Sequence, residues 1–193
     1  MILTTTEISE VIADFLSKHS NSLECKLYEY DEKVRREGEL SQKICIVKEG
    51  VFRLGKTDKI SQINTTIEFF FQSDIYLPMS LSFPEFPAMF EIKSIENSFS
   101  KINSMYEIDV TQWNLFCEKD KKLKLLYLSY IYNFHHHFLN TLIMCRQNRK
   151  VKDLLLNMYD TKHPILNSGI SEKYIAEYLG TTTNRVKQIL YER

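Results

Sequence analysis

The last stretch of the chain carries polar side chains of the kinds that contact a polyanion. It reads SEKYIAEYLGTTTNRVKQILYER, from Ser171 to Arg193. Its hydrogen-bonding and cationic side chains gather after Gly180: Thr182, Thr183, Asn184, Arg185, Lys187 and Gln188. Asn and Gln can pair with two groups of an adenine edge, while Lys and Arg bind phosphates. Side chains of these types are suited to contacting nucleic acid.

The apolar residues of this stretch predict two short helices that hold those side chains outward. Ser171 can cap a helix over 172–179, and Gly180 stands where a left-handed residue would end it. The inner face is predicted to contain Ile175, Ala176, Leu179, Val186 and Ile189. A small residue, a glycine four positions later and an apolar residue six positions after that are typical of a helix-turn-helix. Thr181 departs from this pattern, which usually has an aliphatic residue there.

In a helix-turn-helix, the start of the second helix meets the bases. We therefore expect one group to read bases: Thr182, Thr183, Asn184 and Gln188. A second group is expected to grip phosphates: Lys173, Arg185 and Lys187, with Arg193 as a further candidate. The alternative interpretation is a small α-hairpin that packs in the core.

The charge of the chain is unevenly distributed, although it sums to zero. Residues 146–193 contain nine Lys and Arg against five Asp and Glu, a net charge of +4, which leaves −4 on residues 1–145. A basic C-terminal block on an acidic body suits a module that contacts a polyanion.

The segment before this block predicts a long helix. Residues 111–150 contain no Gly or Pro, and apolar or packing residues recur at alternating spacings of four and three: Leu123, Tyr127, Tyr130, Phe134, His137, Thr141 and Met144. A second apolar face is formed by Leu128, Ile131, Phe138 and Leu142. Such a heptad favours a helix over 111–145 that pairs with a second copy of the chain. A helix buried within one monomer is the alternative.

Residues 23–108 predict a β-domain. Short runs such as KICIVKEGVFRLGK and SQINTTIEFFF alternate apolar with polar residues and are separated by turn-like segments, as in a sandwich or barrel. A capping-box-like Thr-Thr-Glu and the apolar spacing from Ile8 to Leu16 predict a short helix before it. With 44% hydrophobic residues, the 193-residue chain can form a substantial core.

Several classes of site find no support in the sequence. The four cysteines, Cys25, Cys45, Cys117 and Cys145, lack zinc or iron–sulfur spacing and are expected to be reduced, packed thiols. His135–His137 are consecutive, so they point about 100° apart on a helix and cannot share one ion within a monomer. Metal, haem or a pH-sensitive dimer contact at His137 remain alternatives. We expect a cytoplasmic protein that is not an enzyme, with no cofactor, no metal and no membrane segment.

The order of these elements resembles the catabolite activator / fumarate–nitrate regulator (Crp/Fnr) family of transcriptional regulators. Short motifs carry the resemblance: REGE at 36–39, VKEGVFRL at 47–54 with its hairpin glycine Gly50, FFFQSDIY at 69–76, and KYIAEYLGTTTNRVKQIL at 173–190. The resemblance implies an α+β fold: a jelly-roll-like double-stranded β-helix of the cyclic-nucleotide-binding type, a dimerisation helix and a winged helix-turn-helix that here lacks most of its wing. It implies three units at 1–110, 111–145 and 146–193, and RNA polymerase as a candidate partner.

The residues that bind cyclic nucleotides in that family are not matched here. Its Gly-Glu pair for the ribose falls near Leu77, Pro78 and Met79, and its arginine for the cyclic phosphate near Ala88 or Met89. A buried phosphate without a cation or backbone amides would cost several kcal/mol. We therefore expect these five residues to form a candidate pocket for an apolar ligand, or to be covered by their own aromatic neighbours, and we do not expect cyclic AMP or cyclic GMP to bind.

Taken together, these features favour a homodimeric, sequence-specific DNA-binding transcriptional regulator with an unidentified effector. Two recognition helices would enter successive major grooves of a palindromic operator, about 34 Å apart. Because an arginine of the family's base-reading set is absent, the operator is expected to be richer in A·T pairs. The alternatives are a small-molecule or haem-sensing β-roll whose DNA-binding end is degenerate, and a ligandless interaction module.

Overall fold

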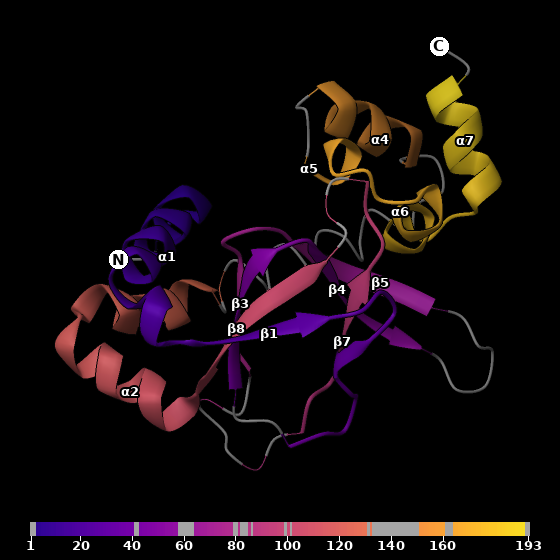
Figure 1. The fold of residues 1–193 in the computed structure, drawn as a ribbon. Coiled ribbons are helices and arrows are strands. Elements are labelled where there is room, and N and C mark those ends of the chain that lie inside the picture. The colour runs from indigo at the N-terminus through magenta and orange to yellow at the C-terminus, as the bar shows by residue number, and fades with distance from the viewer. Residues whose placement is uncertain are drawn as a thin grey trace.

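The β-strands of the chain lie between an N-terminal helical layer and a group of C-terminal helices (Figure 1). The computed structural model describes residues 3–40, 43–57, 64–78, 81, 85, 87–98, 100, 102–130, 132, 151–160 and 164–191. The helices are α1 (Thr5–His19), the 3-10 turn η1 (Ser20–Ser22), α2 (Val110–Lys119), α4 (Val151–Asp160), α5 (Pro164–Asn167), α6 (Glu172–Leu179) and α7 (Thr183–Tyr191). The strands are β1 (Glu24–Tyr28), β2 (Lys33–Arg35), β3 (Lys43–Glu49), β4 (Val51–Thr57), β5 (Asn64–Phe70), β6 (Ile75–Tyr76), β7 (Glu91–Ile95) and β8 (Asn103–Asp109).

Two antiparallel sheets form the β-roll. The first sheet has the order β1-β8-β3-β6 and the second has the order β2-β7-β4-β5. Because side chains alternate between the faces of a strand, Cys45 and Val47 of β3 point into the roll, while Ile44 and Ile46 point outward. The interior cluster contains Tyr28, Cys45, Val47, Phe52, Leu54, Ile67, Phe70, Ile92 and Met105. The expected α+β fold with a β-roll is confirmed.

The outer face of the first sheet is covered by α1, α2 and helical residues 121–130. Ile44, Ile46 and Ile108 of the sheet pack against a helical layer in which Phe15 of α1 meets Trp113 of α2 edge to face, with ring centroids 5.6 Å apart. Helix α1 begins with the expected capping box, since Glu7 N–H donates to Thr4 and the Glu7 carboxylate accepts from Thr4 N–H.

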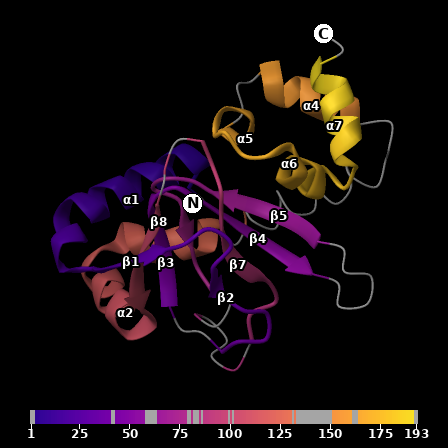
Figure 2. The same ribbon diagram turned by 45° about the vertical axis from the view of Figure 1, so that its right-hand side comes forward.

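The outer face of the second sheet is covered by the C-terminal helices (Figure 2). Val51, Phe69 and Ile95 of that sheet share one buried cluster with residues of α4, α6 and α7. In both views α6 lies nearest to β4 and β5, and α7 lies on the side away from the roll. The helix-turn-helix is thus docked on the β-roll, which the sequence did not predict.

The helix expected over 111–145 is interrupted at Asp120, which corrects that prediction. Asp120 has an extended backbone (φ −129°, ψ 106°), and its carboxylate accepts from Lys122 N–H at 2.8 Å. Aspartate is favoured as the cap of a new helix, so a second helical segment starts immediately after it, at 121–130. Residues 133–150, with His135–His137 and the last part of the predicted heptad, lie outside the described residues.

The hairpin between β3 and β4 depends on Gly50, as the resemblance implied. Gly50 has a φ of +88°, and a Cβ placed there would lie 1.8 Å from Oδ1 of Asn103. Asn103 is fully buried and contacts backbone groups of two strands: its Oδ1 accepts from Val51 N–H, and its Nδ2 donates to the Val51 and Ile95 carbonyls. Glycine is therefore required at this turn for both backbone geometry and space.

Candidate nucleic-acid interface

Helix α6 and the turn after it begin and end at the residues that the sequence predicted. Ser171 caps α6 by accepting from Lys173 N–H at 3.3 Å. Gly180 ends the helix in the left-handed conformation (φ 63°, ψ 36°), and Thr181 N–H then donates to the Ala176 carbonyl at 3.0 Å. Together with the bond from Gly180 N–H to the Glu177 carbonyl, this is a Schellman ending, whose left-handed residue glycine adopts without steric cost.

Five apolar side chains fix how α7 crosses α6. The five predicted inner-face residues, Ile175, Ala176, Leu179, Val186 and Ile189, are all buried. Tyr178 is buried as well, which the sequence analysis did not anticipate, because it packs on Phe69 of the second sheet with ring centroids 5.5 Å apart. Because one face of α7 is held in this core, the opposite face points to solvent.

The exposed face of α7 carries the residues predicted to contact bases and phosphates. Thr182, Asn184, Arg185, Lys187 and Gln188 are exposed, and Thr183 is half-buried. Arg185 Nη1 donates to Gln188 Oε1 at 2.7 Å, one helical turn away. This pair holds a cation and an amide side by side on the surface of the helix.

Two of the predicted contact residues, Thr182 and Lys173, differ from the others in what they contact. The Thr182 hydroxyl accepts from Arg185 N–H at 3.2 Å, so it caps α7. Lys173 stands apart from the α7 group, in the first turn of α6, with its ammonium 5.7 Å from the ring of Tyr174. The Tyr174 hydroxyl faces Asp31 of the roll at 3.4 Å, so Lys173 lies on the side of α6 toward the roll. Arg193 lies outside the described residues.

The residues predicted to form a ligand pocket have different surroundings from one another. Leu77 is buried in the cluster beneath α1 and α2, on the outer side of the first sheet. Pro78 is buried, Ala88 is half-buried and pairs its backbone with Gly38 and Glu39, and Met89 is 53% exposed. Met79 lies outside the described residues. Leu77 and Met89 therefore do not converge on one cavity.

A different cavity, of about 470 Å³, lies at one end of the roll. Its charged lining combines the cations Lys26, Arg35 and Lys43 with the carboxylates Glu39, Glu107 and Asp109. These residues come from separate strands and the β2–β3 turn, so no short motif marks them in the sequence.

Most of that charge is already engaged within the roll. Lys43 Nζ lies 2.7 Å from Glu107, and the Tyr28 hydroxyl also donates to Glu107. Although burial opposes it, these hydrogen bonds hold the pKa of the Glu107 carboxyl below its usual range. Burial raises the pKa of the Cys45 thiol beside the cavity to about 11, so this cysteine is a thiol rather than a reactive thiolate.

The described part of the chain offers neither a metal site nor a membrane-spanning helix. It contains no group of three or more His, Cys, Asp and Glu side chains that could hold a metal ion. It also contains no helix that is long and apolar enough to cross a membrane.

Comparison with known proteins gives matches of structure and none of sequence. No family model matches the chain, and no curated protein matches it. FixK2 from Bradyrhizobium japonicum is similar with a TM-score of 0.69 and 17% identity, over 88% of this chain and 83% of that chain. The c-di-GMP-responsive global regulator CLP from Xanthomonas campestris is similar with a TM-score of 0.68 and 11% identity, over 93% of this chain and 90% of that chain.

A third similar structure is described as a transcriptional regulator of the CRP family. It is TTHB099 from Thermus thermophilus, with a TM-score of 0.60 and 11% identity, over 86% of this chain and 83% of that chain. At these identities the likeness establishes the fold. The chain has the fold of Crp/Fnr-type regulators, a β-roll followed by a C-terminal helix-turn-helix, as the resemblance in the sequence implied.

Proposed function

We propose that the chain is a DNA-binding transcriptional regulator of the Crp/Fnr family. The observation that carries this proposal is α7, whose apolar face is buried against α6 while its threonine, asparagine, arginine, lysine and glutamine side chains point to solvent. The described part of α7 contains no carboxylate, so a phosphate meets cations and hydrogen-bond donors there. A regulator of this kind would act in the cytoplasm.

The proposed active form is a homodimer that pairs through the part of residues 111–145 that follows Asp120. Leu128 and Tyr132 are 63% and 54% exposed and lie one helical turn apart in the segment after Asp120. Large apolar side chains at a spacing of four form a stripe suited to a second copy of the same helix. Units at 1–110, 111–145 and 146–193 would then sense or scaffold, dimerise and bind DNA, on a palindromic site with half-sites one turn apart.

Selection of bound sequences from a random duplex pool tests this function directly. The purified chain, with no added ligand, should enrich a palindrome with half-sites about 34 Å apart. Mutation of Arg185 and Lys187 to Ala should weaken binding to every sequence and reduce its dependence on salt. Recovery of no palindrome, or a double variant that binds as tightly as the wild type, would contradict the proposal.

The charged cavity favours a second candidate function, a small-molecule-sensing β-roll with a degenerate DNA-binding end. About 470 Å³ is enough for a small polar molecule, and both signs of charge are present in the lining. Thermal-shift screening separates the two candidates. A pure sensor would melt at a higher temperature with its ligand and would show no salt-sensitive affinity for DNA.

A further inference from the structure

An ionic cluster around a buried arginine joins the second sheet to the first helix of the helix-turn-helix. Arg53 of β4 is 3% exposed, and its guanidinium reaches two carboxylates. Nη2 lies 3.1 Å from Oε1 of Glu91 on β7, and Nη1 lies 3.0 Å from Oε2 of Glu177 on α6. The Thr66 hydroxyl on β5 donates to the same Glu177 oxygen at 3.1 Å. One guanidinium thus connects three elements that are distant in sequence.

The cluster occupies a space that the backbone provides for it. The pairing of β4 with β5 shifts register between Leu54 and Gly55. A Cβ placed on Gly55 would lie 2.6 Å from the Thr65 carbonyl oxygen and 3.2 Å from Nη1 of Arg53. Any larger residue at position 55 would therefore press on the strand partner and on the guanidinium.

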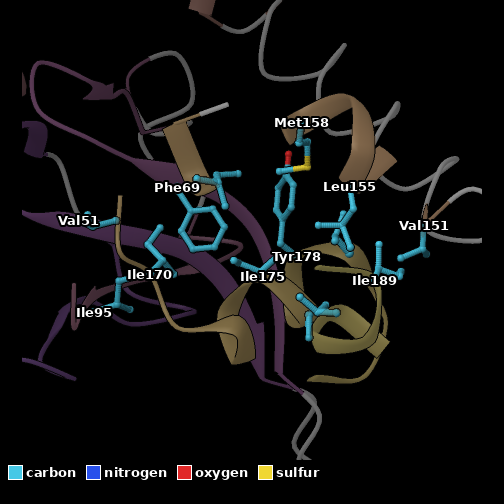
Figure 3. Packing of buried hydrophobic residues seen from close by; sticks show 14 residues of the cluster. Val51, Phe69, Ile95, Val151, Leu155, Met158, Ile170, Ile175, Tyr178 and Ile189 are labelled. Atoms are coloured by element: carbon cyan, nitrogen blue, oxygen red, sulfur yellow. The ribbon is translucent and has the colours of Figure 1, made fainter. Parts of the chain in front are cut away.

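Apolar and polar contacts surround the cluster on the same interface. Phe69 of the sheet packs on Tyr178 of α6, beside Ile170 and Ile175 (Figure 3). At the edges, Ser98 donates to the Gly169 carbonyl at 3.1 Å, and Tyr174 donates to Asp31 at 3.4 Å. The C-terminal helices are therefore held at several separate points of the roll.

The ionic contact adds direction to this interface. Apolar packing is non-directional and allows neighbouring surfaces to slide, whereas the planar guanidinium binds acceptors at fixed angles. Burial of such a charge is costly, and an apolar replacement is often as stable, so a buried ion pair is better explained by geometry than by stability.

We infer that Arg53 is a positioning residue that holds the helix-turn-helix in one orientation on the β-roll, through Glu177. This inference rests on the proposed function. Because α7 is packed on α6, an orientation fixed for α6 is also fixed for α7. In a dimer, the distance between the two α7 helices is then fixed too, so the protein accepts one separation of half-sites and rejects others.

The variant Glu177→Ala cuts this link and spares the roll. Arg53 keeps Glu91 and Thr66 as partners within the second sheet, so the β-roll is expected to fold. The matched control is Glu172→Ala, which removes a carboxylate from the same helix and gives the same change of net charge. Glu172 accepts from the Tyr191 hydroxyl of α7 at 3.3 Å, so this contact lies within the helix-turn-helix.

Hydrogen–deuterium exchange on the purified chain, without DNA, is the first readout. Amides of residues 172–191 should exchange at least about tenfold faster in Glu177→Ala than in the wild type or in Glu172→Ala, because a charge-assisted contact is lost. Glu177→Gln keeps an oxygen acceptor and should restore most of the protection. Wild-type exchange in Glu177→Ala would overturn the inference.

The second readout is binding to palindromes whose half-sites are moved apart or together by one or two base pairs. The wild type and Glu172→Ala should prefer one separation at least tenfold, and Glu177→Ala should bind all separations within about threefold of one another. If amide exchange rises in Glu177→Ala but the preference for one half-site separation stays, Arg53 does not position α7 and the inference fails. If the wild type binds no duplex, the proposed function fails, and exchange alone still decides whether Glu177 fixes the docking.

Discussion

The two sheets of the roll are covered on their outer faces by helices of very different character. Over the first sheet, α1 and α2 pack through aliphatic and aromatic side chains such as Phe15 and Trp113. Over the second sheet, the C-terminal helices combine an apolar cluster with the buried charges of Arg53 and Glu91 and the half-buried charge of Glu177. The helices on the first face are held by apolar packing, while those on the second face are also held by ionic hydrogen bonds, which are directional. The difference suits two roles: the first helical layer stabilises the roll, and the second is held in a fixed orientation on the roll.

The largest effect is expected from Trp113→Ala on the first face. Trp113 is 1% exposed, and truncation of a buried aromatic residue typically costs about 3–5 kcal/mol. Since this layer shares one buried cluster with the first sheet, the whole chain should lose stability in one transition. Urea denaturation followed by circular dichroism measures this loss. A second, separate transition would show that the helical layer unfolds independently of the roll.

A smaller loss, about 2–4 kcal/mol, is expected from Phe69→Ala on the second face. Phe69 packs on Tyr178 of α6, so its removal should loosen the C-terminal helices before the roll. Limited proteolysis should cut near residues 161–171 earlier than in the wild type, while the roll keeps its resistance. Equal sensitivity of both parts would remove the distinction between the two faces.

Gly55→Ala should cost about 1–3 kcal/mol, because the added methyl group meets the Thr65 carbonyl and the guanidinium of Arg53. Its effect on the docked helices should exceed its effect on the interior of the roll. Exchange rates of residues 172–191, compared with those of β3 and β8, measure this ratio. A uniform rise in exchange would argue that the strand pairing, and not Arg53, is disturbed.

The smallest effect concerns the edge of the second face. The hydrogen bond from Lys93 holds the pKa of the Asp31 carboxyl below its usual value of 3.8, although partial burial opposes it. A lowered pKa stabilises the fold above the unfolded-state pKa, and this contribution is lost as pH falls through the folded-state pKa. Asp31→Asn should therefore lower the free energy of unfolding at pH 7 by less than about 1 kcal/mol and flatten its fall below pH 4. Unchanged pH dependence would show that the exposed contact with Lys93 contributes nothing.

The helix break at Asp120 has a local signal in the sequence, which the helical pattern of the surrounding residues made easy to overlook. Residues 111–150 contain no Gly or Pro, and a heptad of large side chains begins at Leu123, so a continuous helix over 111–145 was the expected structure. Both spans pack against the first sheet, through Trp113 in α2 and through Leu123 and Leu126 after Asp120. Asp120 itself was a usable sign of a helix start, because aspartate is a favoured N-cap and its carboxylate accepts from the amide of Lys122.

The sequence by itself determined the features that depend on near neighbours. The Thr4–Glu7 capping box, the cap of α6, the left-handed Gly180 and the buried face of α7 all arise within a few residues, so periodicity and cap chemistry are sufficient to predict them. The tertiary structure alone decided where the helix-turn-helix rests and which charges line the cavity. Arg53 lies 38 residues from Glu91 and 124 from Glu177, and no spacing rule links positions that only the pairing of strands and the docking of helices bring together.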